Sequence, residues 1–323
     1  MKSLFRLLSF VLLTSGLAYA QDYPTKPIRL IVGFAPGGGT DYVGRMIGQR
    51  LSDALGQPVV VENRPGASSM VANELVAKSA PDGYTLLVAA AGAMTIAPNI
   101  NTNVGFDTFK DFEPIALVVT SPYLLTVNPS VPAKTLAEFT ALAKASPGKL
   151  NFASSGTGGA PHLAGELYKR MARVDIVHVP YKGLAPAITD VLGGQVQAVF
   201  ADINLVLKQI EAGKLKALAI TGTQRFSALP DVPTMAEAGL PGYQAQTWYG
   251  LVAPAGTPAP IIKRLHAEVS KALALPEVRS QFATQGMLPA SASATPADFA
   301  ALIRADFDKW RKLIKEAGIK ASG

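Results

Sequence analysis

The stretch Gly37-Gly38-Gly39-Thr40-Asp41 is the part of this chain best suited to bind a ligand. It follows a mostly apolar run, Ile28 to Val32, and precedes a helical pattern, which predicts a strand, a glycine-rich loop and a helix. Glycines there expose backbone N–H groups at the positive end of the helix, where anions are stabilised. A flexible turn without a ligand is the alternative interpretation.

The spacing of these glycines does not match a nucleotide-binding loop. Tyr42 stands where G-x-G-x-x-G requires its last glycine, and no Gly-Lys-Ser/Thr sequence follows. Thr40 and Asp41 stand where a helix N-cap is expected. Asp41 therefore has two interpretations: it caps the helix, or it holds an ammonium group or a water network on the ligand.

Further loops rich in small residues follow other predicted strands. They are Asn63 to Ser69 after Val59–Val61, Ala89 to Ala93 after Leu86–Val88, and Ser154 to Gly159 before a helix starting near Pro161. Small residues permit close approach to a ligand, and these loops share hydrogen-bond donors without a fixed charge. In a last candidate segment, Tyr181 has a polar tip, and Lys182 either attracts a carboxylate or is an ordinary exposed lysine.

The sequence offers little to support catalysis. His162, His178 and His266 are widely spaced and lack the spacing of a zinc site, and the chain has no cysteine. Gly-x-Ser-x-Gly is absent, and the Ser-x-x-Lys match at Ser146 falls in a Pro-Gly turn. We therefore expect a protein that is not an enzyme and that binds neither a cofactor nor a metal.

Residues 1–20 have the order of a secretory signal peptide. Lys2 and Arg6 precede an apolar stretch, Leu7 to Leu17, and then Ala18-Tyr19-Ala20. This stretch is shorter than the ~20 residues of a membrane-spanning helix. Cleavage before Gln21 is expected, with a buried helix or a membrane anchor as alternatives, and no cysteine follows that could carry a lipid. The formal net charge of +7 is scattered without a Lys/Arg run, so no nucleic-acid partner is expected.

Short apolar runs alternate with helical patterns along most of the chain. Strands are predicted at 28–32, 59–61, 86–88, 115–119 and 124–127, and later at 176–179, 198–200, 217–220 and 249–252. Helices are predicted near 69–79, 185–192 and 205–211, and two amphipathic helices end the chain, the second capped at Thr295. This alternation predicts a largely parallel sheet covered by helices, and the length favours two domains.

The ordered set of motifs resembles the substrate-binding proteins of tripartite tricarboxylate transporters, the Bug or TctC-like family. The resemblance rests on the segments Phe34 to Asp41, Asn63 to Ala67, Pro81 to Leu86, Val179 to Gly183, Pro233 to Gly239 and Ala253 to Pro258. The resemblance implies a periplasmic-binding-protein (Venus flytrap) fold with two α/β domains and a ligand cleft between them. It further implies that the C-terminal helices return to the first domain. The implied domains are residues 21–121 plus 249–323 and residues 122–248.

The resemblance also implies a carboxylate ligand held by backbone amides, hydroxyls and water. Carried onto this chain, the ligand-binding residues are Phe34, Ala35, Gly37, Gly38, Gly39, Thr40, Asp41, Ala67, Ser68, Ser155, Gly156, Thr157, Tyr181, Lys182 and Asp202, with Trp248 a weaker candidate. Ala90, Ala91 and Ala93 depart from the hydroxyl residues often found in their loop. This departure weakens the expectation of direct polar contact from that loop and permits a more apolar ligand body.

The expected function is capture of a small organic carboxylate in the periplasm and its delivery to the membrane permease subunits of a tripartite transporter. A monomer is expected. A ligand-binding sensor subunit of a receptor kinase and a periplasmic hydrolase or lyase acting on carboxylates are the alternatives.

Overall fold

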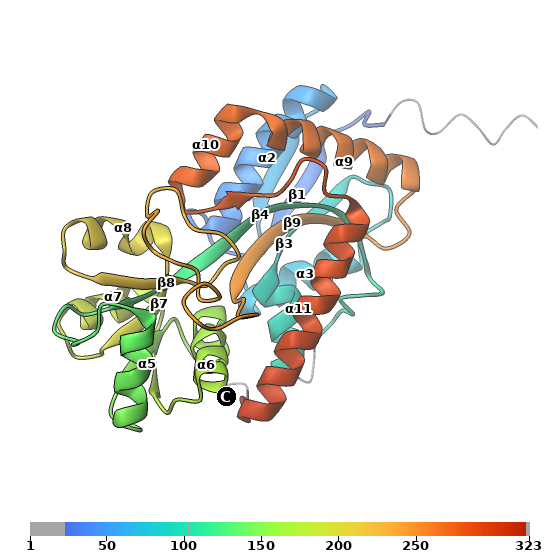
Figure 1. The fold of residues 1–323 in the computed structure, drawn as a ribbon. Coiled ribbons are helices and arrows are strands. Elements are labelled where there is room, and N and C mark those ends of the chain that lie inside the picture. Colours follow the sequence, from blue (N-terminus) through green and yellow to red (C-terminus); the bar gives the residue numbers. More distant parts are fainter. Residues whose placement is uncertain (1–22, 102–103, 321–323) are drawn as a thin grey trace, which may run out of the picture.

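The computed structural model describes residues 23–101 and 104–320, and the predicted signal peptide lies outside these residues. Helices and strands alternate along nearly the whole of the described chain (Figure 1). Among the helices of this part, none is long and apolar enough to span a bilayer.

The strands form one ten-stranded sheet whose order is β2-β1-β3-β9-β4-β7-β5-β6, with β8 and β10 also paired to β4. The strands are β1 (Ile28–Val32), β2 (Val59–Asn63), β3 (Thr85–Ala90), β4 (Phe112–Val127), β5 (Asn151–Ser154), β6 (Val177–Pro180), β7 (Ala198–Asp202), β8 (Lys216–Ile220), β9 (Gln246–Pro254) and β10 (Leu288–Pro289). The first lobe contains β1, β2, β3, β10, most of β9 and the start of β4. The second lobe contains the end of β4 with β5, β6, β7 and β8.

The sheet is mixed, which corrects the prediction of a largely parallel sheet. β1 is parallel to β2 and β3, and β5 is parallel to β6 and β7, as strand–loop–helix repetition requires. β4 and β9 are antiparallel to each other and to every other strand with which they pair. They connect the lobes and are not part of the repeats.

β4 is one strand of 16 residues where the sequence predicted two separate strands. Pro122 lies between the two predicted strands, and proline cannot donate to a strand ladder. In the structure Pro122 is the last residue of β4 paired with β9, and Tyr123 is the first paired with β7. The proline thus stands where the strand exchanges its neighbours, and the chain stays extended through it.

The helices cover both faces of the sheet. They are α2 (Gly39–Leu55), α3 (Met70–Ala77), α4 (Ala97–Ile100), α5 (Leu136–Ala145), α6 (Ala160–Ala172), α7 (Leu184–Leu192), α8 (Ile203–Glu211), α9 (Ala259–Ala274), α10 (Pro276–Thr284) and α11 (Pro296–Ala317), with single turns η1 (Ala67–Ser69) and η2 (Gly92–Ile96). In the first lobe, α2, α9 and α10 pack on one face and α3, η2 and the start of α11 on the other. In the second lobe, α5 and α6 lie on one face and α7 and α8 on the other.

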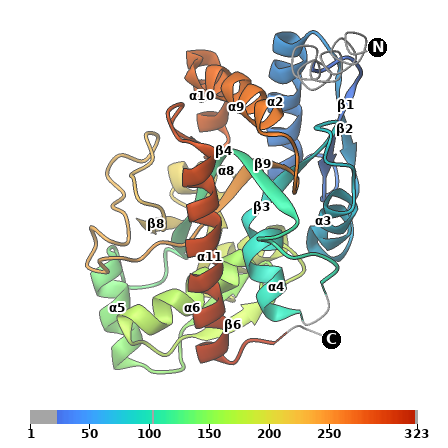
Figure 2. The same ribbon diagram turned by 90° about the vertical axis from the view of Figure 1, so that its right-hand side faces the viewer.

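Helix α11 contacts both lobes. Phe299 and Ile303, near its start, pack with the first lobe, whereas Trp310, Leu313 and Ile314 pack with the core around α6. Figure 2 shows the helix running from the α9–α10 end of the molecule down to α6. Thr295 caps this helix in a capping box with Asp298, which confirms the predicted cap. The domain boundaries inferred from the sequence stay a prediction.

Candidate functional site

The first glycine loop connects β1 to α2. Gly37 has a φ of +91°, which favours glycine, while Gly38 is extended and forms the N-cap of α2 without a side-chain bond. Phe34 lines a cavity described below, whereas residues 35–38 are exposed and Gly39 is half-buried outside it. The loop therefore contributes to this cavity through Phe34, and the glycines that the sequence singled out lie beside it.

Asp41 and Thr40 are not N-caps, which corrects one of the two sequence interpretations. They are the third and second residues of α2, because the helix begins at Gly39. Asp41 is buried, and its Oδ2 accepts hydrogen bonds from the Gly37 N–H and Arg45 Nε, each at 2.9 Å. Its Oδ1 accepts one from Asn63 Nδ2 at 2.9 Å.

These contacts assign Asp41 to holding the loop in place. Burial alone would raise the pKa of Asp41, but the hydrogen bonds from Arg45, Gly37 and Asn63 outweigh it and keep the pKa below its ordinary value. Both carboxylate oxygens already have protein partners, and Asp41 does not line the cavity. Asn63 Nδ2 also donates to the Phe34 carbonyl at 3.0 Å. This network therefore positions Phe34, the residue of this loop that lines the cavity.

The second loop, between β2 and α3, has an unusual backbone. Ala67, Ser68 and Ser69 have φ values of 45°, 55° and 75° in succession. Left-handed conformations cost non-glycine residues about 1–2 kcal/mol each, and such strain is concentrated at functional sites. Ser68 lines the cavity, and Ala67 is exposed outside it. Ser69 lies so close to Gly33 that a Cβ there would approach its Oγ within 1.7 Å, so only glycine fits at position 33.

The third loop follows β3 and forms η2 and α4. Gly92, Ala93, Ile96, Ala97, Ile100 and Asn101 line the cavity from this segment. Ala89 to Ala93 were considered as a candidate loop, but no helix was predicted after them, so residues 96–101 were missed. Their position after a strand neighbouring β1 was the one available signal, because Pro98 and the small residues give no helical period.

The second lobe provides the opposite wall. β5 ends at Ser154, and Ser155, Gly156, Thr157, Gly158, Gly159 and Ala160 then line the cavity up to the first residue of α6. Gly156 and Gly158 have φ values of +137° and +77°, which only glycine adopts readily. The hydroxyls of Ser155 and Thr157 and the backbone N–H of Ala160, the first residue of α6, are donors for an anion. Pro161 has no N–H, and the N–H groups of Gly158 and Gly159 donate within the protein.

Two histidines form hydrogen bonds with the loop that makes up this wall. His162 Nδ1 accepts the Gly158 N–H at 3.0 Å, and His178 Nε2 lies 2.7 Å from Ser154 Oγ. Their rings stack with centroids 3.8 Å apart. Burial lowers the pKa of His162 to about 3 and that of His178 to about 4, so both rings are neutral near pH 7. An accepting Nδ1 places the His162 proton on Nε2, on the side of Glu166.

The remaining predicted residues do not line the cavity. Tyr181 donates to Asp190 Oδ2 at 2.6 Å, which raises its pKa to about 12, and Lys182 is exposed. Asp202 is half-buried at the end of β7, where burial raises its pKa to about 6. Trp248 is buried in β9 and donates to Asp306 Oδ2 at 3.1 Å.

The cavity itself has a volume of about 440 Å³ and is bounded by both lobes. It brings together Phe34 and Ser68 of the first lobe with Ser155, Gly156 and Thr157 of the second, five of the fifteen predicted residues. In the described part of the chain, no Asp, Glu, Lys, Arg or His side chain lines it. The described residues likewise hold no cluster of three or more side chains suited to a metal ion.

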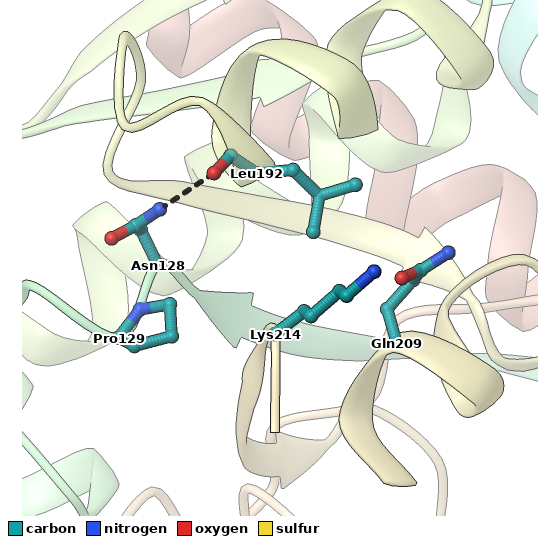
Figure 3. Close-up of a pocket in the computed structure, with 5 residues that line it drawn as sticks. All are labelled: Asn128, Pro129, Leu192, Gln209 and Lys214. Carbon is teal, nitrogen blue, oxygen red and sulfur yellow. Dashed lines mark hydrogen bonds between the residues drawn. The ribbon is translucent and has the colours of Figure 1, made fainter. Parts of the chain in front are cut away.

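A second depression, of about 560 Å³, lies entirely in the second lobe. It is lined by Asn128, Pro129, Leu192, Gln209 and Lys214 (Figure 3). Asn128 Nδ2 donates to the Leu192 carbonyl at 3.2 Å, so its amide serves the loop beside it. This depression is more open than the cavity and is lined by one lobe alone, so we take the cavity between the lobes as the candidate site.

Comparison with known proteins agrees with this architecture. Residues 43–319 match the family described as "Tripartite tricarboxylate transporter family receptor". The chain belongs to this family. Protein BugT of Bordetella pertussis is 37% identical over 324 residues, covering 99% of each chain. The resemblance to Bug and TctC-like proteins is thereby confirmed.

Two solved structures of this kind contain ligands. Rpa4515 of R. palustris, determined with adipate, is 35% identical, with a TM-score of 0.78 over 93% of this chain and 99% of its own. MatC from Rhodopseudomonas palustris, with bound malate, is 36% identical, with a TM-score of 0.74 over 90% of this chain and 100% of its own. The likeness extends over both lobes, and it confirms the predicted two-domain Venus flytrap fold of this TctC-family receptor.

Proposed function

We propose that this chain is a periplasmic solute-binding protein that captures a small organic carboxylate between its two lobes. The observation that carries the proposal is the cavity bounded by strand-end loops of both lobes, with neutral donors and no charged side chain among the described lining residues. Ligands in α/β proteins bind outside the carboxyl ends of strands, and Phe34, Ser68 and Ser155 all follow such ends. Adipate in Rpa4515 and malate in MatC support a carboxylate as ligand.

In this proposal the two lobes share the work of binding. Ser155, Thr157 and the backbone N–H of Ala160 hold the carboxylate, directly or through water, while Ser68 binds it from the first lobe. Phe34 packs on the carbon skeleton of the ligand. Asp41 and Asn63 act indirectly by fixing the Phe34 loop. The lobes, residues 21–121 plus 249–323 and residues 122–248, close because the ligand favours the closed state.

The proposal also includes location and delivery. A signal peptide at residues 1–20 would export the chain to the periplasm, where the monomer would deliver ligand to the permease subunits of a tripartite transporter. Membership of a receptor family supports binding without turnover. Loss of carboxylate uptake in a deletion strain, restored by the wild-type gene, tests the transport step separately from binding.

Binding itself is tested by thermal unfolding of the purified protein with a panel of organic carboxylates. A ligand that binds the folded form raises the unfolding temperature in proportion to saturation. We expect at least one carboxylate to do so, and Ser155→Ala to weaken its binding about fivefold, as for one neutral hydrogen bond. A panel in which no carboxylate shifts a cooperative unfolding transition would contradict the proposal.

A further inference from the structure

The wall of the cavity formed by η2 and α4 is built almost entirely from hydrocarbon. Ala93, Ile96, Ala97 and Ile100 line this wall beside Gly92; the first three are buried, and Ile100 is half-buried. Ile100 reaches across to the second lobe, because a Cβ on Gly158 would come within 2.7 Å of its Cδ1. The two walls therefore meet at an apolar contact between Ile100 and Gly158.

The polar side chains of this segment already have partners within the protein. Thr95 is fully buried, and its Oγ1 lies 2.8 Å from the Ala91 carbonyl and 3.0 Å from Asp306 Oδ2. Asn99 Nδ2 donates to the Thr95 carbonyl at 2.7 Å. Asn101 lines the cavity, but its Nδ2 donates to the Ala97 carbonyl at 2.9 Å. Asn101 keeps its Oδ1 as an acceptor at the end of this wall. Hydroxyl groups of a ligand lying against Ala93, Ile96 and Ala97 would lose water without gaining equivalent hydrogen bonds from these side chains.

In the described part of the chain, charged side chains are also missing from this wall. Among the described residues, no side chain lining the cavity carries a charge, and the nearby Asp41 is paired with Arg45 at 2.9 Å. A carboxylate can be held at the Ser155 to Ala160 end, where the donors gather. An ammonium or a second carboxylate against η2 and α4 would have no ionic partner, and desolvating it there is unfavourable.

We propose that the ligand is a carboxylate with a hydrocarbon body, an alkyl chain or a ring without hydroxyl groups, that lies against Ala93, Ile96, Ala97 and Ile100. This inference rests on the proposed function and adds the class of ligand. Hydroxylated di- and tricarboxylates of similar size are the compounds that this wall selects against. Burial of hydrocarbon against this wall, chiefly against the half-buried Ile100, supplies the affinity, and the donors of the opposite wall fix the orientation.

The class of ligand is tested by calorimetric titration of the purified protein with four probes. Hexanoate and benzoate have hydrocarbon bodies, and malate and citrate carry hydroxyl groups. We expect the better hydrocarbon probe to bind at least about tenfold more tightly than malate and citrate. Malate or citrate binding as tightly or more tightly overturns this inference and leaves carboxylate capture standing. Failure of every carboxylate, these four included, overturns both.

A pair of substitutions tests the wall itself. Ile100→Thr keeps the branch at Cβ and replaces the ethyl arm with a hydroxyl, so we expect hydrocarbon probes to bind about three- to tenfold more weakly and malate to bind unchanged or better. Ser155→Ala, in the donor wall, should weaken both classes by a similar factor. Ile261→Thr on α9, also half-buried but outside the cavity, is the matched control and should change neither. Equal weakening of both classes by Ile100→Thr overturns the inference.

Discussion

The stacked histidines beneath the donor wall show how single residues prepare this site. His162 contacts the backbone N–H of Gly158, and His178 contacts Ser154, so the pair holds both ends of the loop that would receive the carboxylate. Neither ring lines the cavity. Because His162 accepts at Nδ1, only the neutral ring can fill this place, and burial keeps its pKa far below neutrality. The histidines therefore position the loop and carry no charge to the ligand.

Replacement of His162 separates positioning from packing. His162→Leu removes the acceptor and leaves the Gly158 N–H without its partner, a cost of about 1–3 kcal/mol, so we expect ligand affinity to fall about tenfold. His162→Asn keeps an oxygen near the place of Nδ1 and should recover most of the affinity. Calorimetric titration with the strongest carboxylate found in the panel measures both variants.

His266→Asn is the control for loss of a histidine elsewhere, since His266 Nδ1 lies 3.0 Å from the Ile115 carbonyl in the first lobe. It should bind as the wild type does. If His162→Leu also binds as the wild type does while remaining folded, the loop does not depend on His162 and this account of the pair is wrong.

Asp202 predicts a dependence of stability on pH. Burial raises its pKa from 3.8 to about 6, so the folded state binds more protons than the unfolded state between these values. Its contribution to stability is present below pH 4, falls as the pH rises to 6, and stays lost above that. Asp202→Asn should therefore raise the unfolding temperature at pH 7.5 and change it little at pH 4. An equal shift at both values, measured by scanning calorimetry, would contradict the raised pKa.

Asp41 and His178 show what the local sequence does not reveal about single residues. Phe34, Ser68 and Ser155 were predicted from the family resemblance, and each also lies in a loop after a strand end, which is a property of the local sequence. The partners of Asp41 include Asn63, 22 residues away, and Ser154 meets His178 across 24 residues. Whether a carboxylate or a histidine ring already has such a partner within the protein depends on packing between elements. No local sequence pattern predicts that packing.

At the scale of elements, η2 and α4 are held from behind by a buried carboxylate. Asp306 of α11 accepts from Thr95 of η2 at 3.0 Å and from Trp248 of β9 at 3.1 Å. Lys309 lies 2.6 Å from its other oxygen. Asp306 thereby ties the apolar wall to a strand that crosses between the lobes and to the helix that contacts both.

Removal of this carboxylate should destabilise the fold. Asp306→Ala leaves the Trp248 N–H buried without a partner and the Lys309 ammonium without its counter-charge, at a cost of about 3–5 kcal/mol, whereas the Thr95 hydroxyl keeps the Ala91 carbonyl. We expect a clear fall in the midpoint of urea unfolding. Asp308 lies on the exposed side of the same helix, so Asp308→Ala should shift the midpoint only slightly. Similar midpoints for the two variants would contradict the role of Asp306.

Elements were predicted where their pattern is local. Ile28–Val32 is a buried apolar run and was predicted with its bounds, and the strong stripe of α11 was predicted with its cap at Thr295. η2 and α4 were missed because Ala, Gly and Pro98 give no periodic pattern. The union of two predicted strands into β4 also could not be foreseen, since pairing of Pro122 with β9 is a tertiary contact.

At the scale of the whole molecule, the two lobes are joined by strands that continue through both. β4 pairs with β9 up to Pro122 and with β7 and β8 beyond it, so bending of these strands would move one lobe against the other. The cavity lies where such a movement would bring Phe34 and Ser68 toward the loop after Ser154. A ligand that contacts both loops would favour the closed arrangement.

Closure can be observed by small-angle X-ray scattering of the purified protein. We expect the radius of gyration to decrease when the strongest carboxylate of the panel is added at saturation. Ser155→Ala at the same concentration, below its saturation, should show a smaller decrease. An unchanged radius at full occupancy would contradict closure of the lobes, although binding would remain.

The most direct measurement is a crystal structure of the protein with its strongest carboxylate ligand. The account predicts the carboxylate within hydrogen-bonding distance of Ser155, Thr157 or the backbone N–H of Ala160, and Phe34 and Ile100 against the rest of the molecule. A ligand bound elsewhere, such as beside Asn128 and Lys214, or one whose carboxylate points away from both serine loops, would contradict it.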